Sequence, residues 1–287
     1  MLNVNKINCP YCRSNAFVYN LLDTKRFLCH SCQRDQLYER VLENDNNRTD
    51  KLYNLIDSFS GLDIKENINY NSILLYCKKL AELPNSHVSV KYVRNRRIRS
   101  ELDMDLFYTE DLGEIANKAG YNLNRQDKEP RLIIPIRDSH DKLYGLQARS
   151  LNPKSEYRYI TLYFNKKERL YGLNKVDVTK PFNVCEGPID SFFIENCIAL
   201  CGSNDLDNKY STLATVILDN EPRNVQIVNK MLKYVERGFR IVVWPDNIKQ
   251  KDINDMVMSD LDVNDIVLKN VYDKLQAKIK INNWKKV

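Results

Sequence analysis

Acidic residues stand at three points in the C-terminal part of the chain where a predicted strand has just ended. They are Glu186 after segment 181–185, Asp219 and Glu221 after segment 213–218, and Asp252 beyond segment 239–244. The carboxyl ends of parallel strands meet at one edge of a sheet, so these side chains should lie close together. A single acid at such a place is ordinarily a helix N-cap, but that role does not account for three acidic groups together. Carboxylate oxygens are hard ligands, and the pattern predicts a site for Mg²⁺ or Mn²⁺.

The elements around these acids alternate between strands and helices. An amphipathic helix is predicted over 222–237, because Val228, Met231 and Val235 recur on one face and Gly238 follows its end. Repeated strand–helix units of this kind form a mainly parallel sheet covered by helices on both faces. We therefore expect an α/β subdomain over 179–287.

Two Cys-x-x-Cys pairs near the N-terminus predict a zinc ribbon. The four thiols are Cys9, Cys12, Cys29 and Cys32, with 16 residues between the pairs. The intervening residues are β-prone, residues 33–42 are predicted to be helical, and the polar stretch 43–52 is predicted to be a linker. Zinc can replace the hydrophobic core in a domain of residues 1–42, and the ribbon can also contact nucleic acid; both roles stay open.

The middle segment is basic and is predicted to mix helices with strands. Helices are expected over 71–83 and 86–98, and strands over 131–138 and 141–150. The second helix ends in five cations without a neighbouring acid, which fits either a solvated face or phosphate contact. They are Lys91, Arg94, Arg96, Arg97 and Arg99. Near the strand ends, Arg137, Gln147 and Arg149 are expected to converge on a phosphate.

Composition limits the class of protein. The chain of 287 residues has 44 basic and 38 acidic side chains, a net charge of +6, and its first 100 residues carry most of the excess. It contains no stretch of about 18 apolar residues and no secretory signal, which predicts a cytoplasmic protein without a membrane contact.

The motifs resemble those of a known family. Strand-Glu186-Gly187-x-x-Asp190 and strand-Asp219-x-Glu221 resemble the TOPRIM domain, in which the first acid is followed by glycine. Segments 134–138, 145–149, 158–161 and 170–173 resemble the basic subdomain that precedes TOPRIM in DnaG-type DNA primases. With the four-cysteine ribbon, the resemblance extends over nearly the whole chain and is greatest to the stand-alone primases of T-even-type tailed phages.

This resemblance implies an enzyme that synthesises short RNA primers on single-stranded DNA by metal-dependent nucleotidyl transfer during phage replication. It implies one Zn²⁺ in the ribbon, catalytic Mg²⁺ or Mn²⁺ on the four acids, NTPs as substrates, and a separate replicative helicase as partner in a primosome. The basic subdomain would cover 53–178. Nucleotide or template would be bound by Arg137, Arg149, Arg158, Lys166, Lys167 and Asp190.

The chain departs from the family pattern at two positions. Glu221 stands where the second motif ordinarily has aspartate, and Asn254 stands where bacterial primases have aspartate in the third motif. Whether Asp246, Asn254 or Asp255 joins the metal site therefore stays open. Two other functions also stay open: a TOPRIM nuclease or repair factor, and a non-catalytic zinc-ribbon protein that binds DNA as a recombination mediator.

Overall fold

A computed structural model of the protein describes residues 5–8, 15–21, 24–29, 34–37, 70–121, 128–164, 169–202 and 205–287. For the first four of these ranges it describes the backbone alone. The chain divides into two compact units, Met1–Ile68 and Asn69–Val287.

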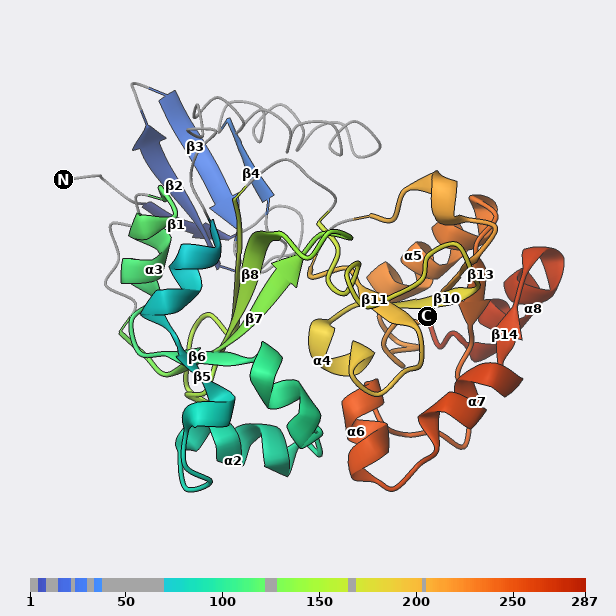
Figure 1. Ribbon diagram of the computed structural model, residues 1–287. Helices are drawn as coiled ribbons and strands as arrows, with labels where there is room; N and C mark the ends of the chain where they lie inside the picture. Colours follow the sequence, from blue (N-terminus) through green and yellow to red (C-terminus); the bar gives the residue numbers. More distant parts are fainter. Residues whose placement is uncertain are drawn as a thin grey trace. The chain divides into compact units, whose positions relative to one another are not determined.

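Four antiparallel strands are described in the first unit. They are β1 (Asn5–Asn8), β2 (Asn15–Leu21), β3 (Thr24–Cys29) and β4 (Arg34–Leu37), in the order β1-β2-β3-β4 (Figure 1). The helix predicted over 33–42 is wrong where the structure describes it, because β4 pairs with β3 through Arg26↔Leu37 and Cys29↔Arg34. Its residues are adequate helix formers, but pairing with a strand across the turn overrides that weak local preference.

The second unit contains two five-stranded sheets, of which the first is antiparallel, in the order β5-β6-β7-β8-β9. Its strands are β5 (Lys78–Lys79), β6 (Phe107–Thr109), β7 (Arg131–Arg137), β8 (Leu143–Ser150) and β9 (Tyr159–Tyr163). The accompanying helices are α2 (Val88–Asn95), α3 (Leu112–Lys118) and 3₁₀ helices over Tyr70–Tyr76, Leu80–Glu82 and Ser100–Asp105. The predicted helix over 71–83 is thus two 3₁₀ segments separated by a short strand.

The second sheet has the order β11-β10-β12-β13-β14 and is parallel except for its last pair. Its strands are β10 (Phe182–Cys185), β11 (Cys197–Ala199), β12 (Ala214–Val216), β13 (Arg240–Val242) and β14 (Val271–Tyr272). A 3₁₀ turn over Asn208–Tyr210 precedes β12. The mainly parallel sheet predicted from the sequence is therefore confirmed.

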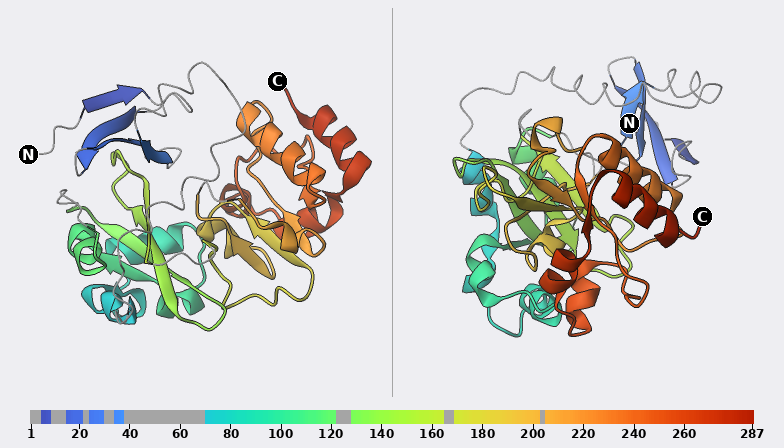
Figure 2. Two further views of the ribbon diagram at one scale, coloured as in Figure 1. Left: turned by 90° about the horizontal axis from the view of Figure 1, so that it is seen from above. Right: turned by 90° about the vertical axis from the view of Figure 1, so that its right-hand side faces the viewer.

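Helices cover both faces of this second sheet. They are α4 (Pro188–Ser191), α5 (Val225–Glu236), α6 (Ile253–Met258), α7 (Val263–Lys269) and α8 (Lys274–Trp284). Alternate strand residues face opposite sides, so Val184 packs with α5 and α8, whereas Cys185 packs with α4, α6 and α7. Figure 2 shows α5 and α8 side by side on their face. Of the helices described, none has the length and apolar character needed to cross a membrane.

One buried cluster joins the two sheets. It contains Leu132 and Ile134 from β7 together with Val242 from β13 and Met256 from α6, all fully buried. A shared core of this kind fixes the antiparallel sheet with respect to the parallel one, because neither can move without exposing apolar surface. The boundary at 178 between a basic subdomain and the C-terminal subdomain stays a sequence-based proposal, and this core extends across it.

Gly145 provides a test of the antiparallel sheet. A Cβ atom at this position would lie 2.7 Å from the carbonyl oxygen of Leu162 and 2.9 Å from Cδ1 of Tyr163. The backbone of β9 would have to move, so we expect Gly145→Ala to lower the free energy of unfolding by about 1–3 kcal/mol. Urea denaturation measures this change. Ser139→Ala, in the exposed turn before β8, serves as the control and should stay within about 0.5 kcal/mol of wild type; equal stability of the two variants would refute the close approach.

Candidate metal and nucleotide site

Glu186 and Asp219 meet at the carboxyl edge of the parallel sheet. Their strands β10 and β12 are hydrogen-bonded neighbours in which Val184 is opposite Val216, so both chains leave the sheet at the same edge. The backbone N–H of Asp219 donates to Oε2 of Glu186 at 3.2 Å. The first two predicted acidic groups are therefore adjacent, as the strand pattern indicated.

Asp190 and Asp252 extend this acidic edge. Burial, followed by the charges of Glu186, Asp190 and Asp252, raises the pKa of Asp219 to about 8. Burial, followed by the charge of Asp252, raises the pKa of Asp190 to about 7, although the backbone N–H of Asn254 donates to it at 3.1 Å. The charges of Glu186 and Asp252 thus oppose the ionisation of Asp190 and Asp219. Asp190, predicted as a nucleotide or template contact, belongs electrostatically to the acidic group.

Two lysines neutralise acids at this edge. The ammonium group of Lys230 donates to Oε1 of Glu186 at 2.7 Å, and that of Lys251 lies 3.0 Å from Oε1 of Glu221. The other oxygen of Glu221 accepts from Nδ2 of Asn224 at 3.1 Å. Glu221 consequently lies in the segment that precedes α5, with both oxygens occupied, on the rim of the acidic group.

The donor set suits a hard divalent cation. The acids offer only oxygen, and the pKa values of Asp190 and Asp219 are raised first by burial and then by neighbouring carboxylates, whose repulsion a divalent cation would relieve. Among the residues that the structure describes, however, no three His, Cys, Asp or Glu side chains are grouped as a ready-made ligand set. Lysine ammonium groups hold two of the predicted ligands instead.

The third acidic motif is now better defined. Asp252 caps α6 by accepting from the backbone N–H of Asp255 at 2.7 Å, while Asp246 and Asp255 are exposed. Asn254 is 2 % exposed, and its side chain donates to the carbonyl of Arg96 at 2.9 Å and accepts from the Arg96 guanidinium. Because both ends of this amide are engaged, Asn254 connects α6 to the end of α2 rather than offering a free oxygen to a metal.

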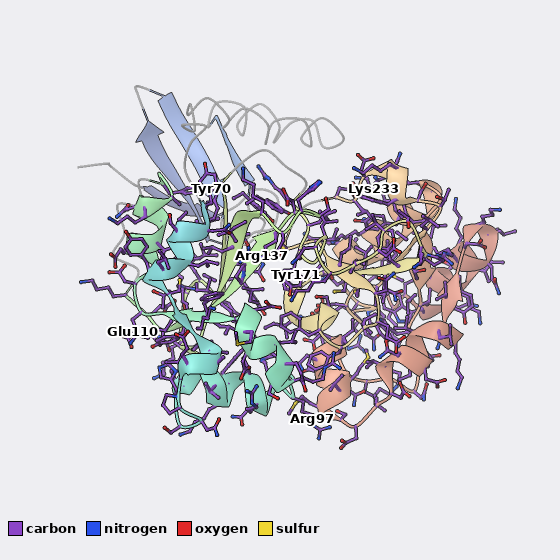
Figure 3. All side chains as sticks on the ribbon, in the orientation of Figure 1. Tyr70, Arg97, Glu110, Arg137, Tyr171 and Lys233 are labelled. Carbon is purple, nitrogen blue, oxygen red and sulfur yellow. The ribbon has the colours of Figure 1, made fainter. Side chains whose placement is uncertain are left out.

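The run of cations at the end of α2 has a structural role that neither sequence interpretation included. Arg94 forms a two-pronged pair with Asp103, which is 8 % exposed, and Arg97 pairs with Asp260 beyond α6. Arg97 also donates to the carbonyl of Val257 at 2.8 Å, and Figure 3 shows it beside α6. These arginines therefore fasten α2 to its surroundings.

Arg149 lies near the acidic edge between two aromatic rings. It is 8 % exposed, and its guanidinium carbon lies 4.5 Å from the ring centroid of Tyr159 and 5.9 Å from that of Tyr92. Its Nε has no hydrogen-bond partner in the described part of the chain. Burial raises the pKa of Tyr159 to about 12, and the charges of both Arg149 and Asp190 act on it, which places this cation–aromatic pocket close to Asp190.

Arg137 does not converge with Arg149, contrary to the prediction. Arg137 is opposite Leu143 at the turn of the β7–β8 hairpin, whereas Arg149 is opposite Leu132 near the other end. At about 3.4 Å per residue, the two are separated by roughly 17–20 Å along the hairpin. Arg137 instead donates to the carbonyl of Asp141 at 2.9 Å. One phosphate group cannot contact both arginines.

The remaining predicted residues are only partly covered. Arg158 is exposed and stands next to Tyr159 at the start of β9. Lys166, Lys167, Cys9, Cys12 and Cys32 lie outside the described residues, and Cys29 is described only as the last backbone position of β3.

Sequence reasoning missed Lys230, Lys251, Tyr92 and Tyr159 as neighbours of the site. The sequence does not mark a lysine on an exposed helix face or a tyrosine in a strand as a site residue. Its part in the site depends on contact with an element that is distant in the chain. Two clues were available: Lys251 adjoins the predicted ligand Asp252, and Tyr159 belongs to segment 158–161, which resembles a family motif.

Comparison with known proteins places the chain near the primases. No protein-family model matches it. It is 31% identical over 220 residues to the DNA primase of Enterobacteria phage T4, a match that covers 74% of this chain and 64% of that protein. The chain thus spans slightly less than two thirds of the length of the curated relative that it matches.

Solved structures show the same fold. The RNA polymerase domain of the Mycobacterium tuberculosis primase DnaG, solved with a double-stranded DNA oligomer carrying a 6-nucleotide overhang, matches with a TM-score of 0.56 and 14% identity over 74% of this chain and 81% of that one. The Aquifex aeolicus primase, comprising zinc-binding and RNA polymerase domains, matches with a TM-score of 0.50 and 15% identity over 98% of this chain and 80% of that one. The chain therefore has the mixed α/β fold of these primase structures.

The raised pKa of Asp219 predicts how stability depends on pH in metal-free protein. An unfolded Asp releases its proton near pH 4, whereas folded Asp219 keeps it to about pH 8. The folded state binds more protons between these values, so the free energy of unfolding falls as pH rises from 4 to 8. We expect Asp219→Asn, measured by urea denaturation with a chelator, to flatten this slope and to gain at least on the order of 1 kcal/mol at pH 8 relative to wild type.

Asp273→Asn is the matched control, since Asp273 is exposed and its side chain makes no capping hydrogen bond. Its pH profile should follow the wild type. An unchanged slope in Asp219→Asn would show that Asp219 ionises normally in the folded protein.

Proposed function

We propose that this protein is a DNA primase that synthesises short RNA primers on single-stranded DNA by metal-dependent nucleotidyl transfer. The observation that carries the proposal is the 31% identity to the phage T4 DNA primase, in a chain whose acids Glu186, Asp190 and Asp219 gather at one sheet edge. The fold shared with primase RNA polymerase domains supports it. The C-terminal subdomain, 179–287, is proposed to be TOPRIM.

The acidic edge is the proposed metal site, with Glu186, Asp219 and Asp252 as ligands and Glu221 joining from the rim. Bound Mg²⁺ or Mn²⁺ would activate the attacking 3′-hydroxyl and stabilise the charge that develops as pyrophosphate leaves. The chain's own part is to hold these oxygens at a rigid sheet edge, where desolvation strengthens their attraction for a cation. No Ser or Cys nucleophile is required for this chemistry.

The pocket around Arg149 is the proposed contact for nucleotide or template. Tyr159 is 39% exposed, which leaves ring surface on which a base can stack, and the nearby guanidinium can meet a phosphate or base edge. The charge of Asp190 acts both on Tyr159 of this pocket and on Asp219 of the acidic edge. Arg158, Lys166 and Lys167 are proposed to extend the basic surface, and Arg137 would contact a separate part of the nucleic acid, given its place at the hairpin turn.

The first unit is proposed to be a zinc ribbon over 1–42, with a linker over 43–52. Four antiparallel strands support this, and the Aquifex relative, which contains a zinc-binding domain, matches 98% of the chain. Cys9, Cys12, Cys29 and Cys32 would hold one Zn²⁺ through four thiolates. The ribbon would help to select where synthesis starts on the template.

One assay distinguishes the proposed function from its alternatives. Purified protein is incubated with single-stranded DNA, labelled NTPs and Mg²⁺, and the products are separated by size. Short oligoribonucleotides are expected. Cleaved DNA would indicate a TOPRIM nuclease, and a DNA mobility shift without either product would indicate a non-catalytic binding protein.

A replicative helicase is proposed as a partner in the cytoplasm of an infected cell, on the family resemblance alone. Titrating the helicase encoded with this protein into the priming assay at physiological salt should raise the primer yield. If the protein alone synthesises primers undiminished at this salt, and added helicase does not change the yield, a helicase partner is excluded.

Glu186→Gln tests the metal site. The amide keeps the shape of the side chain but removes the charge that attracts a divalent cation, so we expect primer synthesis to fall by on the order of 10²-fold or more. DNA binding, measured by fluorescence anisotropy, should stay close to wild type. The control is Glu195→Gln. Glu195 is an exposed glutamate that follows α4, and its replacement should leave full synthesis. Wild-type activity in Glu186→Gln would remove Glu186 from the catalytic site.

Cys29→Ser tests the ribbon. Loss of one thiolate should abolish the single equivalent of zinc per chain, which atomic absorption measures. Initiation at preferred template sites should be lost, whereas extension of a preannealed primer should persist because the acidic edge belongs to the other unit. Cys77→Ser, outside the two cysteine pairs, should keep its zinc. A Cys29→Ser protein with full zinc would contradict the four-cysteine site.

A further inference from the structure

Lys230 brings its ammonium group to the acidic sheet edge, and the packing of apolar side chains does not explain this position. It lies on α5, where neighbouring Val228 and Met231 are buried against the parallel sheet. Its side chain reaches the sheet edge, and its ammonium group lies 2.7 Å from Oε1 of Glu186, with side-chain exposures of 27% and 24% for the two partners. A lysine on the covering helix therefore pairs with the first predicted metal ligand.

Glu186 is held from two sides. Its Oε2 accepts the backbone N–H of Asp219, and its Oε1 accepts from Lys230. The backbone contact is fixed by the pairing of β10 with β12, whereas the ammonium group stands at the end of a flexible four-carbon stem. Of these two contacts, the one to Lys230 can be exchanged without moving the backbone.

The charges at this edge favour such an exchange. The charges of Glu186 and Asp252 both act on Asp190 and Asp219, whereas the ammonium group of Lys230 contacts Glu186, only one of these four acids. A divalent cation brings twice the charge and a shorter approach to several oxygens at once. A partly exposed ion pair is a weak interaction, so it presents little obstacle to displacement.

We infer that Lys230 is an exchangeable counter-ion and nucleotide-binding residue: it neutralises Glu186 in the metal-free protein, releases it when the divalent cation binds, and then binds the triphosphate of the incoming nucleotide. This inference rests on the proposed function, since it takes an NTP as the substrate. The released ammonium group stays beside the acids, where a metal-bound triphosphate brings several negative oxygens within reach of a flexible lysine.

The alternative is a permanent ion pair in which Lys230 only orients Glu186. The two roles predict opposite changes in metal affinity. If Lys230 competes with the cation, its removal tightens metal binding; if it orients the ligand, its removal weakens binding.

The first test measures Mn²⁺ binding without nucleotide, by isothermal titration calorimetry or by the electron paramagnetic resonance of free Mn²⁺. Lys230→Met keeps the aliphatic stem and the helix propensity, and it should bind Mn²⁺ on the order of 10-fold more tightly than wild type. Lys230→Gln should behave in the same way, which guards against a packing effect of one variant. Equal or weaker Mn²⁺ binding in both would overturn the inference.

Lys233→Met is the matched control. Lys233 lies on the same helix (Figure 3), and its ammonium group pairs with Asp205 at 2.9 Å rather than with Glu186. Its Mn²⁺ affinity should equal that of wild type. Tighter binding in this control as well would attribute the effect to general charge removal and would also overturn the inference.

The second test separates nucleotide binding from chemistry. In extension of a preannealed primer at saturating Mg²⁺, Lys230→Met should raise the KM for NTP on the order of 10-fold with a smaller change in kcat, and Lys230→Arg should restore part of the loss. An unchanged KM would refute the contact with the triphosphate. Absence of primer synthesis by the wild type would instead refute the proposed function, and the Mn²⁺ comparison would still decide whether Lys230 competes for Glu186.

Discussion

Mutual repulsion among carboxylates at one desolvated sheet edge is the constraint around which the rest of the second unit is arranged. Parallel pairing of β10 with β12 brings Glu186 and Asp219 together, and helix α4 and the N-cap of α6 add Asp190 and Asp252. Burial in the company of like charges raises the pKa of two of these acids toward neutrality. Such an arrangement opposes folding unless cations are supplied, and this is why lysines from the loop before α6 and from α5 reach toward the acids.

The second consequence concerns rigidity. Oxygens can bind a cation strongly only if they are held in place, since otherwise the cost of ordering them would cancel the gain. Here the buried cluster shared by β7, β13 and α6 joins the two sheets, and the amide of Asn254 connects α6 to the end of α2. The amide adds no negative charge beside Asp190, to which the backbone N–H of Asn254 donates, and it connects the two halves of the unit. One residue thus contributes both to the charge balance and to the rigidity of the site.

The arginines of this unit fall into two sets, those that pair with side chains of the protein itself and one that does not. Arg94, Arg96 and Arg97 are engaged with Asp103, Asn254 and Asp260, so a concentrated run of cations serves internal pairing more than solvent or phosphate. Arg149, by contrast, lies beside aromatic rings, and its buried Nε has no hydrogen-bond partner within the described residues. Burial without a partner is costly, which favours a role in binding over a role in stability.

The sequence by itself determined the features that depend on neighbouring residues: the strand-then-acid spacing of Glu186 and Asp219, the parallel sheet implied by alternating elements, and the paired cysteines. Only the tertiary structure decided which cation faces each acid, that Asn254 binds Arg96, that Arg137 and Arg149 are far apart, and that residues 34–37 form a strand. The physical reason is the same in each case. Lys230 and Glu186 are 44 positions apart, and Arg96 and Asn254 are 158 apart, so their contacts follow from how the sheets and helices pack and leave no periodicity or spacing in the chain.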